Sequence, residues 1–70
     1  MVYGSAHEAV PPGWRAFRSN TGRWWATRER PWPRSVAGTG VERTVDGDDE
    51  IALARAIAEQ EARAALAGAQ

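Results

Sequence analysis

Two short runs, residues 14–19 and 23–29, are rich in aromatic and polar residues, in the manner of short β-strands. Between the two runs lies an Asn-Thr-Gly sequence, residues 20–22. Glycine readily takes a positive φ, so Gly22 can close a three-residue hairpin loop. The pattern therefore predicts an antiparallel hairpin.

The length of that loop determines which side chains share a face of the hairpin. A three-residue loop pairs Phe17 with Trp25 and Ala16 with Ala26, whereas a loop of two or four residues changes the partners and puts Trp24 beside Phe17. With three residues, the face that we assign to the core carries Trp14, Ala16, Trp24 and Ala26, with Arg18 and Arg28 at its margin. The opposite face carries Arg15, Phe17, Arg23, Trp25 and Thr27.

The rest of the chain predicts a loop, a third strand and a helix. Residues 30–40 contain prolines that cannot continue a β-ladder, so we expect a loop with Trp32 at its tip. Residues 41–45 alternate and predict a third strand. The acidic run 46–50 supplies an N-cap and a negatively charged first turn for a helix from about Asp48 to about Ala67. The expected fold is α+β: a small three-stranded antiparallel sheet packed on one C-terminal helix, in the order βββα.

Two sides can be recognised on the predicted helix. Arg55, Glu59 and Arg63 repeat every four residues and predict a solvated ladder of ion pairs. The other side is rich in alanine, which lets a helix approach a sheet closely. We expect that side to pack on the hairpin; it carries Leu53, Ile57 and Ala64, flanked by Ile51, Ala54, Ala58 and Ala65. Glu61 interrupts it, which suggests a narrow contact or a second partner there.

Length and composition limit the chain to one small domain. With 70 residues and no cysteine, it has a small core and no disulfide to stabilise it. We expect a flexible leader at 1–13, the folded domain at 14–67 and a tail at 68–70. The leader has no basic residue and does not resemble a secretory signal, and no apolar run reaches the roughly 20 residues that span a bilayer. We therefore expect a cytoplasmic protein without membrane contact.

Charge is distributed unevenly along the chain although the formal net charge is zero. Residues 14–34 contain six arginines, all four tryptophans and one acid, whereas residues 41–70 contain seven acids and three arginines. A zero total removes the long-range attraction of a basic protein for nucleic acid, so any such binding must come from a local patch.

The arginine and tryptophan residues of the hairpin are the main candidates for function. Cations that bind phosphates lie there beside flat rings on which bases can stack. We expect a small non-enzymatic protein that contacts nucleic acid through this surface. The candidate residues are Arg15, Phe17, Arg18, Arg23, Trp25, Thr27, Arg30, Trp32 and Arg34.

Three alternatives remain open. Phe17 and Trp25 can simply complete a small core with arginines at its rim, and Trp32 can fold back over the core edge. The same sheet face, or the alanine-rich helix, can instead bind a protein partner or a second copy of the chain. In that case the protein would be an interaction module or a homodimer.

Catalytic, metal and cofactor sites are not indicated. A calcium loop starting at Asp46 would need glycine at position 51 and glutamate at position 57, where this chain has Ile51 and Ile57. His7, the single histidine, lies in the expected leader, so no histidine or lysine of the folded part can activate a nucleophile. We expect no enzyme activity, no metal and no cofactor.

The layout from Trp14 to about Ala65 resembles the three-stranded DNA-binding domain of plant ethylene-response factors and the arm-binding amino-terminal domains of phage-type integrases. The matching residues are Arg15 and Arg18, then Gly22-Arg23-Trp24 and Ala26, then Thr44-Val45-Asp46 before an alanine-rich helix. This resemblance implies that the sheet lies in the DNA major groove, with contacts from Arg15, Arg18, Arg23 and Trp25. The chain departs from the plant family at Glu42-Arg43, where a Leu-Gly pair is typical, and in its shorter first loop. A similar element order occurs in antitoxins of the HicB type, which implies a protein partner instead.

Overall fold

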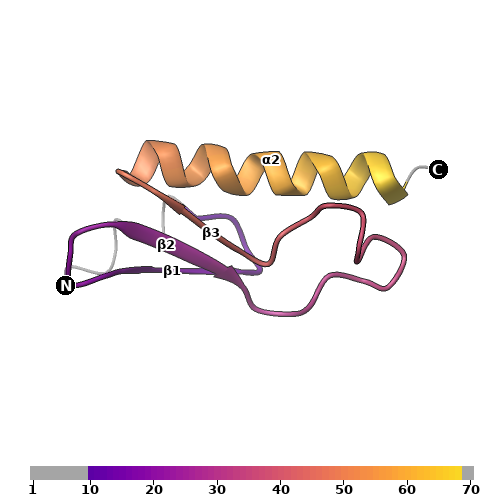
Figure 1. Cartoon of the computed structure of the whole chain (residues 1–70), viewed down its shortest axis with the longest axis horizontal. Coiled ribbons are helices and arrows are strands. Elements are labelled where there is room, and N and C mark those ends of the chain that lie inside the picture. Colours follow the sequence, from indigo (N-terminus) through magenta and orange to yellow (C-terminus); the bar gives the residue numbers. More distant parts are fainter. Residues whose placement is uncertain (1–9, 69–70) are drawn as a thin grey trace.

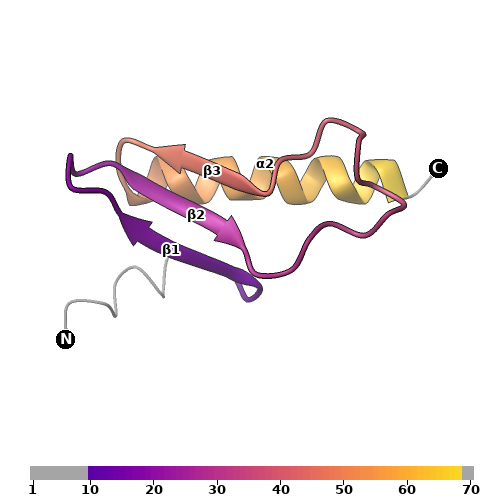
Figure 2. The same cartoon turned by 60° about the horizontal axis from the view of Figure 1, so that its bottom comes forward.

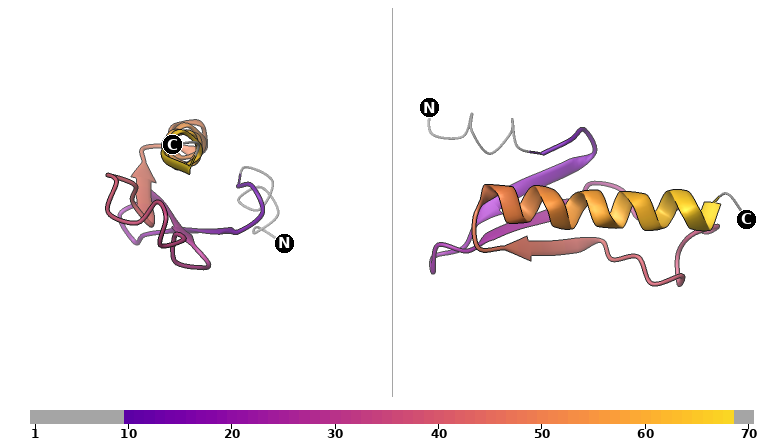
Figure 3. Two further views of the ribbon diagram at one scale, coloured as in Figure 1. Left: turned by 90° about the vertical axis from the view of Figure 1, so that its right-hand side faces the viewer. Right: turned by 90° about the horizontal axis from the view of Figure 1, so that it is seen from above.

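The computed structural model describes residues 10–68, which form three strands and one helix (Figure 1). The elements are β1 (Trp14–Arg18), β2 (Trp24–Arg28), β3 (Thr44–Gly47) and α2 (Glu50–Gly68). The sheet is antiparallel with the strand order β1-β2-β3, and α2 lies over one of its faces (Figure 3). The predicted α+β fold with the order βββα is confirmed. Most of the predicted leader, including His7, and the last two tail residues lie outside the described residues.

The hairpin between β1 and β2 has the predicted register. Ser19 N donates to the carbonyl oxygen of Arg23 at 2.9 Å, and Gly22 N donates to that of Ser19 at 3.0 Å. Gly22 has a φ of +85°, which closes the loop at a conformation that glycine adopts without a steric penalty. Phe17 therefore pairs with Trp25, and the hairpin loop has three residues.

The core lies between α2 and the face of the sheet that we assigned to it. Trp14, Ala26, Leu53 and Ile57 are buried together, and Trp24 and Val45 pack at the margin. Ala26 is on the central strand, where its small side chain lets the larger side chains of α2 approach the sheet. Val10, which precedes β1, also packs against this cluster.

The start of α2 corrects one packing prediction. Asp49 Oδ1 accepts a hydrogen bond from Ala52 N at 2.8 Å, so Asp49 is the N-cap and the helix begins at Glu50. Ile51, which we expected in the core, is 65% exposed. It lies two residues before Leu53, which is about 200° around a helix, so the two side chains cannot share a face. Within residues 10–68, α2 lacks the apolar length that a bilayer-crossing helix requires.

The third strand begins three residues later than predicted. β3 pairs Thr44 with Thr27 and Asp46 with Trp25, whereas Glu42 lies before the strand and donates its N–H to Gln60 Oε1 at 2.8 Å. The boundary is thus determined by contacts with β2 and α2 rather than by the local alternation of side chains. The shift places an acidic residue in the strand beside the central tryptophan.

The segment between β2 and β3 is a loop that extends toward the carboxyl end of α2 (Figure 2). Val36, in the middle of this loop, is buried. A Cβ placed on Gly68 would lie 3.8 Å from Val36 Cγ1, so the loop contacts the last turn of the helix. This contact gives the long loop an apolar anchor away from the sheet.

Candidate functional site

The face of the sheet that points away from α2 is the candidate site. In Figure 2 β3 lies in front of α2 and the other two strands lie beside it, and no other described segment crosses the strands. Strand alternation and register place seven residues on this outer face: Arg15, Phe17, Arg23, Trp25, Thr27, Thr44 and Asp46. We refer to this set as the outer face.

A row of three side chains crosses the middle of the outer face. Phe17 on β1 pairs with Trp25 on β2, which pairs with Asp46 on β3. Phe17 is 48% exposed, and Trp25 is half-buried because its strand is the central one. Two aromatic residues therefore lie side by side on a face that no described element covers.

A second row on the outer face lies two residues along each strand from the first, and its side chains are polar. Arg15 pairs with Thr27, which pairs with Thr44. The hydroxyl oxygens of the two threonines are 2.6 Å apart, so one donates to the other. Two hydroxyl groups that share one hydrogen bond leave a further O–H free to donate outward. Arg15 is exposed at the edge of this row.

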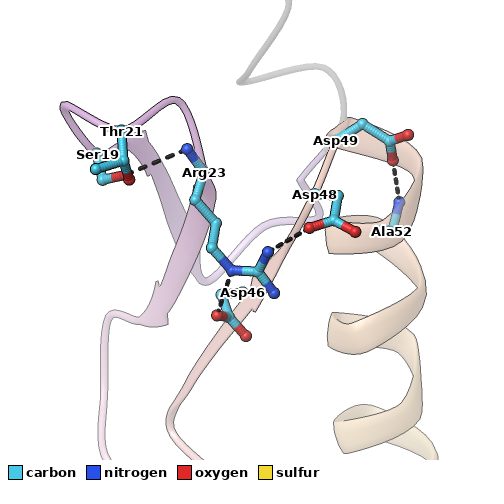
Figure 4. Close-up of polar contacts among 7 residues, drawn as sticks. All are labelled: Ser19, Thr21, Arg23, Asp46, Asp48, Asp49 and Ala52. Carbon is cyan, nitrogen blue, oxygen red and sulfur yellow. Dashed lines mark hydrogen bonds and ion pairs between the residues drawn. The ribbon is translucent and has the colours of Figure 1, made fainter.

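Arg23 connects the hairpin to the turn before α2 (Figure 4). Its Nε donates to Asp46 Oδ2 at 2.7 Å and its Nη1 donates to Asp48 Oδ1, while its backbone N–H donates to Ser19 Oγ at 3.2 Å. The hydrogen bonds to Asp46 and then to Asp48 raise the pKa of Arg23 above its ordinary value. The guanidinium therefore stays charged across the neutral range, and its charge is already matched by two carboxylates.

This contact corrects the expectation of a basic surface. Arg15 and Arg23 contribute two positive charges to the outer face and Asp46 contributes one negative charge. Asp48, in the turn after β3, also pairs with Arg23, so these four residues together have no net charge. The outer face is therefore aromatic and only weakly charged. The prediction failed because Asp46 lies in β3 rather than in the helix start.

Arg18, a further candidate residue, lies on the helix side of the sheet. Arg18 is at the hairpin end of β1, with its guanidinium carbon 5.2 Å from the centroid of the Trp24 ring. Arg18 therefore lies at the margin of the core face, as predicted, and its guanidinium stacks on an indole ring. Arg18 therefore does not join Arg15 and Phe17 on the outer face.

Trp32 folds back over the edge of the core. Its ring lies edge-on to Trp14 with centroids 6.1 Å apart, and its Nε1 donates to the carbonyl oxygen of Glu42 at 2.9 Å. The Arg28 guanidinium covers the ring at 3.9 Å. Arg30 and Arg34 are exposed in the same loop, outside the outer face.

Several polar side chains have structural roles that the sequence pattern did not reveal. Glu61 Oε2 accepts a hydrogen bond from Trp14 Nε1 at 2.7 Å, which accounts for an acid on the apolar side of α2. Gln60 is buried, and its Oε1 accepts a hydrogen bond from the backbone N–H of Glu42. Arg43 donates to the carbonyl oxygens of Arg28 and Glu29 at 2.9 and 3.2 Å, where β2 ends. The interruption by Glu61 was the one visible signal of these contacts.

Comparisons with protein-family models, with curated proteins and with solved structures found no match. The resemblance to plant and phage DNA-binding domains therefore stays a prediction.

Proposed function

We propose that this protein is a small non-enzymatic binding protein that contacts nucleic acid through the outer face. The observation that carries this proposal is the pair of exposed Phe17 and half-buried Trp25 on a sheet face that no element within residues 10–68 covers. Aromatic rings on a sheet surface stack on nucleobases and bind them with little dependence on sequence. A ligand that covers this pair would remove apolar area from water, which favours binding.

Arg15 is the cation of the outer face that is available to a phosphate. Among residues 10–68, ion pairs are formed by Arg23 with Asp46 and Asp48 and by Arg63 with Glu59, and Arg15 is in none of them. Its guanidinium has five N–H donors in a fixed fork that matches a phosphate group. Arg15 therefore supplies the electrostatic contact next to the aromatic pair.

Replacing Arg15 with alanine should weaken nucleic-acid binding, because one charge-assisted contact to a phosphate is lost. We expect affinity for a labelled oligonucleotide of about 12 nucleotides to fall about 5- to 10-fold. The slope of log affinity against log salt is negative, and it should become shallower by about 0.7 to 0.9. Fluorescence anisotropy at several salt concentrations measures both quantities.

Arg55→Ala is the matched control, because Arg55 is an exposed arginine on α2, outside the outer face. It should leave affinity and salt slope near the wild-type values. An equal loss in both variants would mean that binding follows total charge rather than the outer face. Absence of binding to single-stranded and duplex probes at low salt would defeat the proposal.

Self-association is a second candidate, favoured by apolar side chains on the side of α2 that faces away from the sheet. Ile51 is 65% exposed and Leu66 is 69% exposed. Exposed Ala58 and Ala62 lie between them on the same side. Of the alanine-rich side that we first considered for a partner, Leu53 and Ile57 pack instead on the chain's own sheet and Glu61 is bonded to Trp14. Ala58 and Ala65, which we expected to flank that contact, are exposed.

A second copy of the chain fits this surface in an antiparallel arrangement. Ile51 lies in the first turn of α2 and Leu66 in the last, so antiparallel helices place Ile51 of one copy against Leu66 of the other. The alanines between them allow close approach of the helix axes. Antiparallel packing also sets the opposite ends of the helix dipoles beside each other.

Light scattering over a range of protein concentrations tests this candidate. The wild-type chain should form a dimer, and the double variant Ile51→Gln with Leu66→Gln should be monomeric with an unchanged far-UV circular dichroism spectrum. Phe17→Gln, an exposed apolar residue on the outer face, should leave the dimer intact. A wild-type chain that is monomeric at all concentrations would exclude this candidate.

A further inference from the structure

We infer that the ligand of the outer face is an unpaired nucleic-acid strand whose bases stack on Trp25 and Phe17. This inference rests on the proposed function and adds the class of nucleic acid. It differs from the resemblance to major-groove binders, which implies a duplex. The placement of charge and of aromatic rings on the outer face carries it.

The charges on the outer face disfavour the binding of double-stranded DNA. Double-stranded DNA carries one negative charge per about 1.7 Å of its axis, and duplex binding depends on several phosphate contacts by cations. A sheet in the major groove lies between two phosphate backbones. The outer face offers Arg15, whereas Arg23 is held by two carboxylates and Asp46 lies directly beside Trp25. These carboxylates would face the phosphates of one backbone or the other.

The aromatic pair favours exposed bases. Cross-strand partners on one face have Cβ atoms about 4.5 to 5.5 Å apart, so Phe17 and Trp25 are adjacent aromatic side chains on the outer face. Base stacking on an aromatic ring contributes about 5- to 100-fold in affinity per base and needs little charge. In a duplex the base faces are covered by neighbouring pairs, and uncovering them costs free energy. An unpaired strand presents these faces without that cost.

Polar groups next to the rings can contact the strand backbone. The Thr27 and Thr44 hydroxyls share one hydrogen bond, and the remaining O–H can donate to a phosphate or sugar oxygen. Arg15 is in the same row. The outer face therefore combines a stacking row with a row of hydrogen-bond donors, at a spacing of two residues along each strand.

The test compares a labelled single strand of about 12 nucleotides with the blunt duplex of the same sequence. Wild-type protein should bind the single strand at least about tenfold more tightly than the duplex. Trp25→Leu keeps an apolar strand residue but removes the ring, and should reduce single-strand affinity about 5- to 100-fold with an unchanged salt slope. Trp25→Phe keeps a ring and should bind within a few-fold of wild type.

Circular dichroism and the urea midpoint establish that each variant is folded. If Trp25→Leu is not folded, Phe17→Leu at the more exposed position serves for the same comparison. Equal or tighter duplex binding, or wild-type affinity in the folded leucine variant, would overturn the single-strand inference and leave nucleic-acid binding standing. A wild-type chain that binds neither probe would overturn both.

Discussion

Replacing Gly47 with alanine should cost about 3 kcal/mol or more in the free energy of unfolding. Gly47 is the last residue of β3 and is buried against the start of α2. A Cβ at this position would lie 2.6 Å from the backbone nitrogen of Leu53 and 2.9 Å from the carbonyl carbon of Ala52. Both contacts are with backbone atoms, so the added methyl group requires a movement of the helix away from the sheet.

Urea denaturation of the two chains measures this cost. A single core in a domain this small rarely supplies more than about 3 to 5 kcal/mol of stability, so the variant should be largely unfolded in buffer. Gly68→Ala is the matched control, since its Cβ would meet Val36 Cγ1 at 3.8 Å, an ordinary contact. A Gly47→Ala chain with the wild-type midpoint would show that β3 and α2 are not this closely packed.

Trp14→Ala should also unfold the domain, because Trp14 has the largest side chain of the buried cluster. It is 6% exposed and lies with Ala26, Leu53 and Ile57. Truncation of a buried tryptophan costs about 3 to 5 kcal/mol, which is comparable with the whole stability expected for a domain of this length. In circular dichroism, the variant should show no cooperative thermal unfolding transition and reduced strand and helix signals.

Trp14→Phe separates packing from hydrogen bonding at the same position. It keeps most of the apolar volume but removes the indole N–H that donates to Glu61 at 2.7 Å. We expect a smaller loss of about 1 to 2 kcal/mol. Glu61→Gln retains an acceptor oxygen and should cost less than Trp14→Phe. A Trp14→Ala chain that unfolds at the wild-type midpoint would contradict the assignment of the core.

The hairpin was predictable from sequence because its determinants are local. Gly22 supplies the positive φ that closes a three-residue loop, and the loop length then determines which residues pair across β1 and β2. The same register placed Ala26 and Trp14 in the core and Phe17 and Trp25 on the opposite face. The helix was also foreseen, from the acidic run before it and the spacing of Leu53 and Ile57.

The errors arose where distant segments determine the structure. The start of β3 depends on its pairing with β2, so local alternation placed it three residues too early. Arg23 is paired with Asp46 and Asp48, which follow it by 23 and 25 residues, and no spacing in the sequence signals that contact. The exposure of Ile51 could have been predicted from helical spacing alone, because Ile51 lies about 200° from Leu53 around α2.

The most informative of these corrections concerns charge. An arginine-rich hairpin predicts a basic surface, but Asp46 on the outer face and the adjacent Asp48 both pair with Arg23, so these three residues and Arg15 together have no net charge. Two other arginines of the hairpin stack on tryptophans on the helix side: Arg18 on Trp24 and Arg28 on Trp32. Under the proposed function, we therefore expect stacking on the aromatic pair to be the main source of binding.

Amide chemical-shift mapping with an unlabelled single strand of about 12 nucleotides tests the central claim most directly. We expect saturable changes at the outer face, at Arg15, Phe17, Trp25, Thr27 and Thr44, while the amides of α2 from Arg55 onward stay unchanged. Changes that gather on α2, or a spectrum that does not change at low salt, would contradict the assignment of the outer face as the binding surface.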